Sequence, residues 1–207
     1  QASELRQLKD IIKRERPFHT HLSPVCRVFS QAYHPFHDER LDDEFWNDYY
    51  LAENIAELAH FLHLEGLYGC IEVPRGARRF WKLERIAELG QLPGWFFIDL
   101  DGCMYGLKHP QTHKAVKKSW RFLTNAWYLV PMGVVCDGTH EHTQLVSKWT
   151  SWSQAYPRLM CKRYVRLVAD GRRGHRAYRS NISALLEVEN FTVVFPGRCD
   201  GQYPSAP

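Results

Sequence analysis

The sequence predicts an α/β protein built on a largely parallel sheet, with helices on the faces of that sheet. Helical and strand-like patterns alternate three times between residues 3 and 103, and each strand-like run is short and rich in apolar residues. Such alternation is typical of parallel strands that are joined by helices. With 207 residues, of which 44% are hydrophobic, the chain is long enough to bury one sizeable core.

The first predicted helix covers residues 3–15, where Ser3 can cap the start and Pro17 follows the end. Its apolar side chains recur at helical spacing, at Leu5, Leu8, Ile11 and Ile12. Residues 17–26 (PFHTHLSPVC) follow as a short alternating strand, which carries Cys26 at its carboxyl end.

The strongest helical pattern covers residues 42–65, and Gly66 ends it. Its apolar positions fall on one side of a helix, at Leu51, Ile55, Leu58, Ala59 and Leu62. Three further elements follow, namely a buried strand at 67–73, a helix at 78–90 and a strand at 94–103.

Chemistry in parallel sheets collects at the carboxyl ends of the strands. We therefore expect Cys26, Glu72 and the Asp101–Cys103 segment to lie at or near one edge of the sheet. Beyond residue 103 the pattern is less regular, and it predicts a strand at 117–125, a Cys/His-rich loop at 134–145, a basic helix at 154–170, an exposed loop at 171–181 and a last strand at 189–197. This organisation divides the chain into an α/β core at 1–103, a basic, Cys/His-containing part of the same domain at 104–197 and a disordered tail at 198–207.

Charge, hydrophobicity and cysteine content indicate which partners and which cellular compartment the sequence favours. The net charge is +4, and the stretch from Pro157 to Arg179 holds eight basic residues against one acid, Asp170. No apolar run approaches the roughly 18 residues that span a bilayer. Six cysteines without a signal peptide favour reduced thiols, so we expect an intracellular protein, nuclear or cytoplasmic. The first residue is Gln, which indicates a fragment or a processed chain.

The first candidate site pairs Cys26 with Glu72. A thiolate is a competent nucleophile only when its pKa is lowered or a base is near, and Arg27 and His21 can supply that environment. A glutamate at the end of a neighbouring strand can protonate or position whatever the thiolate attacks. A structural role for either residue is the alternative.

The segment SPVCRVFS around Cys26 resembles the Pro-Cys loop of cytosine-C5 DNA methyltransferases, P-P-C-Q-x-F-S. In that family an E-N-V segment ends the next strand, and here Glu72-Val73-Pro74 follows Cys26 at a similar interval. A basic strand of the type Q-x-R-x-R has its counterpart in KKSWRFLTN. A narrower resemblance, to methyltransferase-like proteins of phages and eukaryotic mobile elements, rests on the segments CMYGL, KKSWRFLTN, CDGTHEH and QAYPRLMC between residues 103 and 161.

This resemblance implies a partial, Rossmann-like class I methyltransferase fold and a DNA substrate. Cys26 would add to C6 of a cytosine, Glu72 would contact N3 and the exocyclic amine, and Arg121 would hold the base or a phosphate. The methyl donor would be S-adenosylmethionine, and the base would be extruded from the duplex. The chain departs from the family at Val25 and Pro74, and the 25 residues before Cys26 contain no glycine-rich donor-binding loop.

The second candidate site is a metal centre made of Cys103, Cys136, His140 and His142. Thiolates and imidazoles are the ligands of structural zinc sites, and the C-x3-H-x-H spacing places three of them in one loop. Cys161 is a possible substitute ligand. The alternative is a core cysteine beside solvated loop histidines.

The third candidate is a basic and aromatic set that can bind the phosphates of nucleic acid. Its members are Arg27, Lys117, Lys118, Arg158, Lys162, Arg163 and Arg166. A solvated helix face is the plainer interpretation of these charges.

Three functions remain open on the sequence alone. The first is a DNA (cytosine-5) methyltransferase-like domain that uses S-adenosylmethionine, and the second is a non-catalytic, zinc-stabilised module of a mobile element that binds nucleic acid. The third is a cysteine hydrolase or transferase that pairs Cys26 with His21 or His34.

Overall fold

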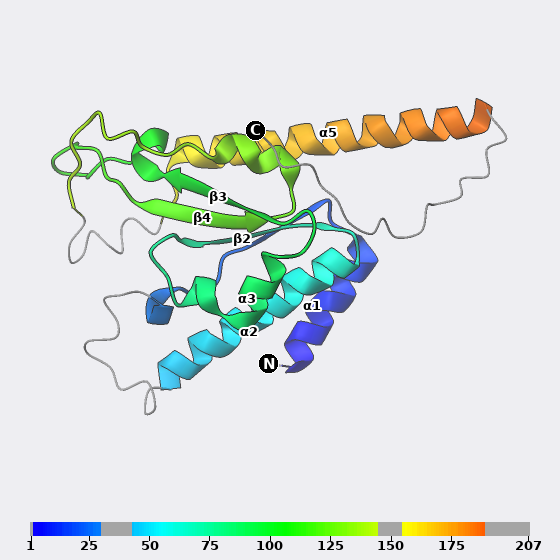
Figure 1. The fold of residues 1–207 in the computed structure, drawn as a ribbon, viewed down its shortest axis with the longest axis horizontal. Helices are drawn as coiled ribbons and strands as arrows, with labels where there is room; N and C mark the ends of the chain where they lie inside the picture. Colours follow the sequence, from blue (N-terminus) through cyan, green and yellow to red (C-terminus); the bar gives the residue numbers. More distant parts are fainter. Residues whose placement is uncertain (1, 30–42, 145–154, 189–207) are drawn as a thin grey trace. The chain divides into compact units, whose positions relative to one another are not determined.

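The computed structural model describes residues 2–29, 43–144 and 155–188, and within this part the chain forms a mixed α/β fold. Four strands make one open sheet in the order β1-β2-β4-β3 (Figure 1). Their bounds are His19–Leu22 for β1, Tyr68–Pro74 for β2, Phe96–Asp101 for β3 and Ser119–Thr124 for β4.

The prediction of a largely parallel sheet is wrong, because only β1 and β2 pair in parallel. β4 lies between β2 and β3 and is antiparallel to both, so β1, β2 and β3 share one direction. Parallel neighbours need a crossover connection, usually a helix. The connection from β3 to β4 holds the 3-10 helix η4 (Gly102–Tyr105) and otherwise irregular backbone, so β4 returns alongside β3. A Rossmann-like fold is therefore not established by this sheet.

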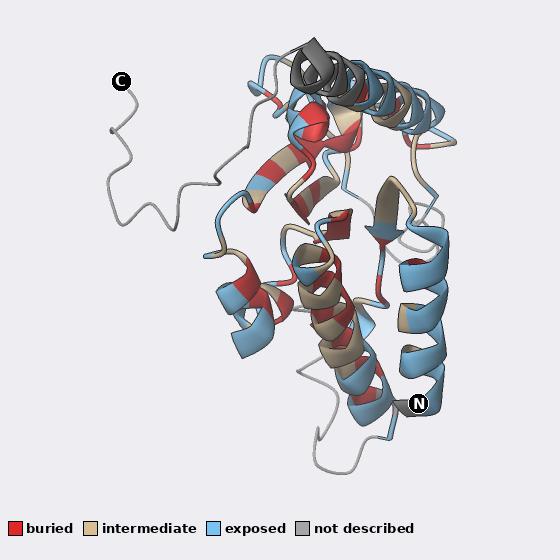
Figure 2. Ribbon diagram, turned by 90° about the vertical axis from the view of Figure 1, so that its right-hand side faces the viewer, coloured by how far each residue is buried: buried red, intermediate tan, exposed pale blue. Residues whose placement is uncertain are grey.

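Two apolar clusters cover the two faces of the sheet. On one face, helices α1 (Ala2–Glu15), α2 (Asp43–Leu64) and α3 (Glu84–Leu89) pack around Ile71, Val73 and Leu123. On the other face, the first half of helix α5 packs over residues such as Trp120 and Phe122. Strand residues alternate between faces, which explains why neighbouring β4 residues belong to different clusters. Buried residues gather where elements face one another, and exposed residues cover the outer sides of the helices (Figure 2).

The first two predicted helices are confirmed as α1 and α2. The helix predicted at 78–90 is two short pieces, the 3-10 helix η3 (Phe80–Lys82) and α3. Leu83 separates them because its backbone is extended, with φ −56° and ψ 134°. The 117–125 strand is confirmed as β4, and the 134–145 segment is irregular as predicted over the residues that are described.

Helix α5 runs from Arg158 to Val188, so the exposed loop predicted at 171–181 is wrong. The buried side of the helix continues through Tyr164, Leu167 and Val168 to Gly171. A Cβ atom at position 171 would overlap the Tyr128 ring. The glycine is therefore explained by close packing rather than by a turn.

Contacts between residues divide the chain into two units, Gln1–Gly171 and Arg172–Pro207. The strand predicted at 189–197 and the tail predicted at 198–207 lie outside the described residues. Among the described residues, none of the helices combines the length and the apolar character needed to cross a membrane. The five cysteines in the described part are free thiols.

Candidate functional site

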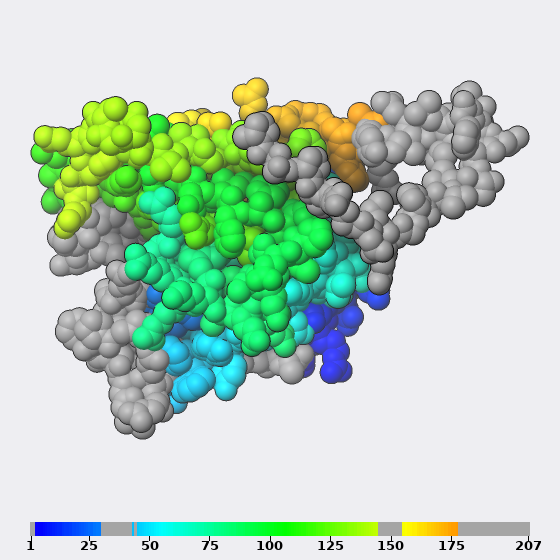
Figure 3. Space-filling model, viewed as in Figure 1, coloured from blue at the N-terminus to red at the C-terminus, as the bar shows by residue number. Residues whose placement is uncertain are grey.

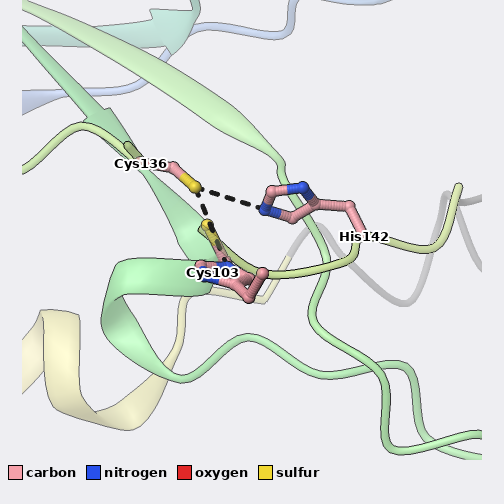
Figure 4. A group of neighbouring side chains, drawn as sticks. Cys103, Cys136 and His142 are labelled. Carbon is pink, nitrogen blue, oxygen red and sulfur yellow. Dashed lines mark hydrogen bonds between the residues drawn. The ribbon is translucent and has the colours of Figure 1, made fainter. Parts of the chain in front are cut away.

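The four predicted metal ligands come together. One ligand atom from each of Cys103, Cys136, His140 and His142 lies within 4.8 Å of the other three. The Cys136 Sγ is 3.4 Å from His142 Nε2 and 3.8 Å from His140 Nε2. Figure 4 shows Cys103 and His142 pointing at the Cys136 sulfur from separate segments of the chain. This cluster can hold a metal ion.

Local backbone structure brings these ligands together. Cys103 lies in η4 directly after β3, and η4 ends at Gly106, whose φ is +76°. Gly138 has φ +81° and donates its N–H to the Cys136 Sγ at 3.3 Å, which turns the chain back towards the sulfur. His142 forms a parallel bridge with Ala115, which fixes the second histidine beside the β3–β4 connection.

The buried carboxylate of Asp101 connects the loop that carries Cys136 to the end of β3. Asp101 is fully buried, lies two residues before Cys103 and accepts the backbone N–H of Cys136 at 2.9 Å. It also accepts a hydrogen bond from the Ser119 hydroxyl, and the amine of Lys117 lies 3.9 Å away. Sequence reasoning placed Asp101 at the strand end but did not predict this role, because the contact depends on a distant loop.

The donor set fits zinc. A tetrahedral ion with Zn–S near 2.3 Å and Zn–N near 2.0 Å requires ligand atoms roughly 3.3–3.8 Å apart, and the cluster is already close to this. Burial and the neighbouring Cys136 raise the pKa of the Cys103 thiol to about 11. Cys161 is exposed on α5 and is not part of the cluster, so the substitute ligand is not needed.

Cys26 and Glu72 lie at one edge of the sheet. Cys26 follows the end of β1 by four residues, Glu72 is near the end of β2, and the two strands are parallel neighbours. Burial raises the pKa of the Cys26 thiol, the charge of Glu72 raises it further, and the charge of Lys118 lowers it. These three groups therefore act on one another electrostatically.

Two hydroxyl groups that sequence reasoning missed hold the Glu72 carboxyl. Glu72 is 3% exposed, and its Oε2 accepts hydrogen bonds from Ser23 Oγ at 2.8 Å and from the Tyr156 hydroxyl. Burial raises the pKa of this carboxyl, and the two hydroxyls oppose that rise. Tyr156 lies in the QAYPRLMC segment, but its partner is 84 residues away and no local pattern indicates the pair.

The environment expected to activate Cys26 is not the one observed. Arg27 lies 3.5 Å from the Asp48 carboxylate, and His21 Nδ1 shares a hydrogen bond with the Tyr164 hydroxyl at 2.8 Å. Burial lowers the pKa of His21, which favours the neutral ring. The cation that acts on Cys26 is Lys118, which the sequence predicted only as a nucleic-acid contact.

Arg121 is on the other face of the sheet from Glu72. In the β2–β4 register Glu72 is opposite Phe122 and Val73 is opposite Arg121, so Arg121 projects towards α2 and α3. Its guanidinium makes a two-pronged contact with Asp99, at 2.7 and 2.8 Å. The structure does not bring Arg121 to the Cys26–Glu72 edge.

The predicted basic residues fall into two groups. Arg27 and Lys117 lie beside Asp48 and Asp101, and the Lys118 amine lies 5.2 Å from the centre of the Trp120 ring. The remaining four are exposed on α5, at Arg158, Lys162, Arg163 and Arg166.

A partly buried cluster of histidine and tyrosine side chains joins β1 to α5. The Tyr164 hydroxyl contacts His19 Nε2 at 2.5 Å as well as His21, and the Tyr128 hydroxyl contacts His19 Nδ1 at 2.8 Å. This engagement weakens the case for a Cys26–His21 hydrolase pair. His34, the other histidine considered, lies outside the described residues.

The turns after β1 and β2 give no support to a binding site for S-adenosylmethionine. A donor of this kind needs a glycine-rich turn that leads from a strand into a helix. In the described part of the chain, β1 continues into Ser-Pro-Val, and the turn after β2 contains the single glycine Gly76.

Comparisons with protein-family models, curated proteins and solved structures find no significant match to this chain. Fold and site therefore define a mixed α/β protein with a four-stranded open sheet and a Cys/His cluster that can hold a metal ion.

Proposed function

We propose that this chain is the base-binding part of a DNA (cytosine-5) methyltransferase-like protein of the phage or mobile-element type, and that a structural zinc ion stabilises it. One observation carries the first half of the proposal. Cys26 and Glu72 follow or end two adjacent parallel strands at one edge of the sheet and act on one another electrostatically. A nucleophile and a proton donor in that relation suit attack on a pyrimidine ring.

Burial supports the role of Glu72 as a proton donor. A raised pKa favours the protonated carboxyl, which can donate to a ring nitrogen such as N3 of cytosine. Ser23 and Tyr156 both bind Oε2, so Oε1 is the oxygen that remains for a base. Arg121 has no part in this version of the site, because Asp99 binds it on the opposite face. Methyl transfer would need a donor site from other residues.

A reaction that needs no methyl donor tests the roles of Cys26 and Glu72. The Cys26 thiol first gives its proton to water, and the thiolate then bonds to C6 of cytosine while Glu72 gives its proton to N3, which makes C5 electron-rich. C5 then takes a proton from water and releases its original hydrogen to water. Finally the S–C6 bond breaks, the sulfur leaves with its electron pair and N3 returns its proton to Glu72. The net result is exchange of the C5 hydrogen with solvent.

The experiment measures tritium release from duplex and single-stranded DNA that carries [5-³H]cytosine, with zinc-loaded protein. Wild type should release tritium, Cys26→Ser should release none above background, and Glu72→Gln should be slower by about 10²-fold. Cys161→Ser is the matched control, because this thiol is exposed on α5 and away from the cluster and from Glu72. Equal release by wild type and Cys26→Ser would refute a nucleophilic Cys26.

A second candidate is the non-catalytic, zinc-stabilised module that binds nucleic acid. Two observations favour it, namely the raised pKa of the Cys26 thiol and the hydroxyls of Ser23 and Tyr156 that already bind Glu72. This candidate predicts DNA binding and bound zinc without tritium release. The tritium experiment therefore separates the two functions.

The zinc half of the proposal is supported by the convergence of four ligand atoms from two parts of the chain. Cys103 comes from the end of β3, and the other three ligands come from the loop after the 3-10 helix η5 (Trp127–Met132). An ion held by both segments would stabilise their irregular backbone. All four positions are filled by protein ligands, which favours a structural role over a catalytic one.

A further inference from the structure

Helix α5 presents a row of three basic side chains, and the acidic residue Asp170 follows the row one helical turn after Arg166. Arg158, Lys162 and Arg166 are four residues apart, which places them on one side of the helix with a rise of about 6 Å between neighbours. All three are exposed, and none forms an ion pair with a described acidic side chain. Figure 3 shows atoms of α5, coloured yellow to orange, at the surface of the molecule.

The row faces away from the sheet. The opposite side of α5 packs into the apolar cluster that contains Trp120 and Phe122. It does so through Met160, Tyr164, Leu167 and Val168. The direction in which the basic side chains project is therefore fixed by packing. A helix surface that served only for solubility would ordinarily mix both signs of charge.

The row begins beside the Cys26–Glu72 edge. Tyr156, whose hydroxyl binds Glu72, comes two residues before Arg158, and Arg158 is the first residue of α5. The first turn of the helix adds unpaired backbone N–H groups and the positive end of the helix dipole, and both favour anions.

We propose that the face of α5 from Arg158 to Arg166 binds the phosphates that flank a base engaged at Glu72. This inference rests on the proposed function, since it takes nucleic acid as the partner. The contacts are to the sugar-phosphate backbone and therefore carry affinity rather than sequence specificity. Arg27 and Lys117, which the sequence also predicted as contacts, contribute less because Asp48 and Asp101 lie beside them.

The test measures how DNA binding depends on salt, by fluorescence anisotropy of a labelled duplex in 50–200 mM salt. The variant Arg158→Gln/Lys162→Gln/Arg166→Gln removes the row with residues of similar helix propensity. The slope of log K against log salt should become shallower by ~2.7, about 0.9 for each lost phosphate contact. The matched control is Arg6→Gln/Lys13→Gln/Arg14→Gln, which removes the same charge from exposed positions on α1, on the other face of the sheet. The control should lose less than one contact.

Two results would overturn the inference. One of them leaves the proposed function standing, and the other also excludes DNA as the partner. If wild type binds DNA and both triple variants change the slope equally, the row is not the contact surface, while the proposed function stands. If wild type does not bind DNA at all, the inference and the proposed DNA partner fail together. Circular dichroism and the thermal midpoint of each variant verify that α5 stays folded.

Discussion

Acid should destabilise this protein through one buried histidine. Both ring nitrogens of His19 are hydrogen-bonded to tyrosine hydroxyls, to Tyr164 at 2.5 Å and to Tyr128 at 2.8 Å. Burial lowers the pKa of His19 to about 4, and the charge of His21 adds to this. Protonation of the folded state is therefore costly, whereas the unfolded chain binds the proton at the ordinary pKa of 6.5.

The size of the effect follows from these two pKa values. Below pH 6.5 His19 becomes protonated in the unfolded state, whereas in the folded state it becomes protonated only near pH 4. The free energy of unfolding therefore decreases as the pH falls from 6.5 to about 4. The loss reaches at most about 3 kcal/mol, at about 1.4 kcal/mol for each pH unit. Above pH 7 His19 contributes no pH dependence, because the ring is neutral in both states.

Urea denaturation at pH 7.0 and pH 4.5 measures this loss in wild type and in His19→Gln, which keeps a polar side chain that cannot take up the proton. The decrease in the free energy of unfolding between the two pH values should be smaller in His19→Gln by about 2 kcal/mol. His60→Gln is the matched control, since the His60 ring on α2 hydrogen-bonds the Arg85 carbonyl in an exposed contact. The other acid-sensitive groups contribute equally to the decrease in wild type and in each variant, so their contribution cancels in the difference between the two proteins. The same decrease in wild type and His19→Gln would refute the reasoning.

Three further predictions follow from other parts of the structure. Gly171→Ala should destabilise the protein by about 1–3 kcal/mol because the new methyl group overlaps the ring beneath it, whereas Gly174→Ala, in open space, should be neutral or stabilising; equal thermal midpoints would contradict this. Lys118→Met should raise the pH midpoint of Cys26 alkylation, followed by peptide mass spectrometry, because it removes the charge that lowers the pKa of that thiol; an unchanged midpoint would show that the two groups do not interact. Asp101→Asn should weaken zinc binding about 10–100-fold in competition with a chelating dye, and undiminished affinity would exclude its anchoring role.

Local patterns predicted much of the fold. The spacing of apolar residues indicated α1 and α2, and short apolar runs indicated the strands, because both patterns depend on neighbours in the sequence. The direction of β4 was not predictable in this way. Its pairing depends on how the β3–β4 connection folds, and no periodicity within the strand carries that information.

The difference between local patterns and contacts between distant segments also explains which site residues could be predicted. The metal ligands were predicted because thiol and imidazole groups are few and three of them share one short loop. Ser23 and Tyr156 were missed because they reach Glu72 from 49 and 84 residues away. Arg121 was assigned to the Glu72 edge by resemblance, but the strand register decides which face it occupies.

Lys118 and one ligand of the proposed zinc site, Cys103, lie on the same segment of the chain, the β3–β4 connection. The β3–β4 connection runs from Gly102 to Lys118 and holds Cys103 in η4. The charge of Lys118 acts on both Cys26 and Glu72. Loss of the ion should therefore loosen the segment that positions this lysine.

The most direct measurement is the zinc content per chain, by elemental analysis of protein purified without chelator, together with its thermal midpoint. We expect one zinc ion per chain in wild type and in Cys161→Ser, and much less than one, with a lower midpoint, in Cys136→Ser. Wild-type protein that holds no zinc and takes up none from zinc-containing buffer would contradict the account. A Cys136→Ser variant that holds zinc as tightly as Cys161→Ser would contradict it as well.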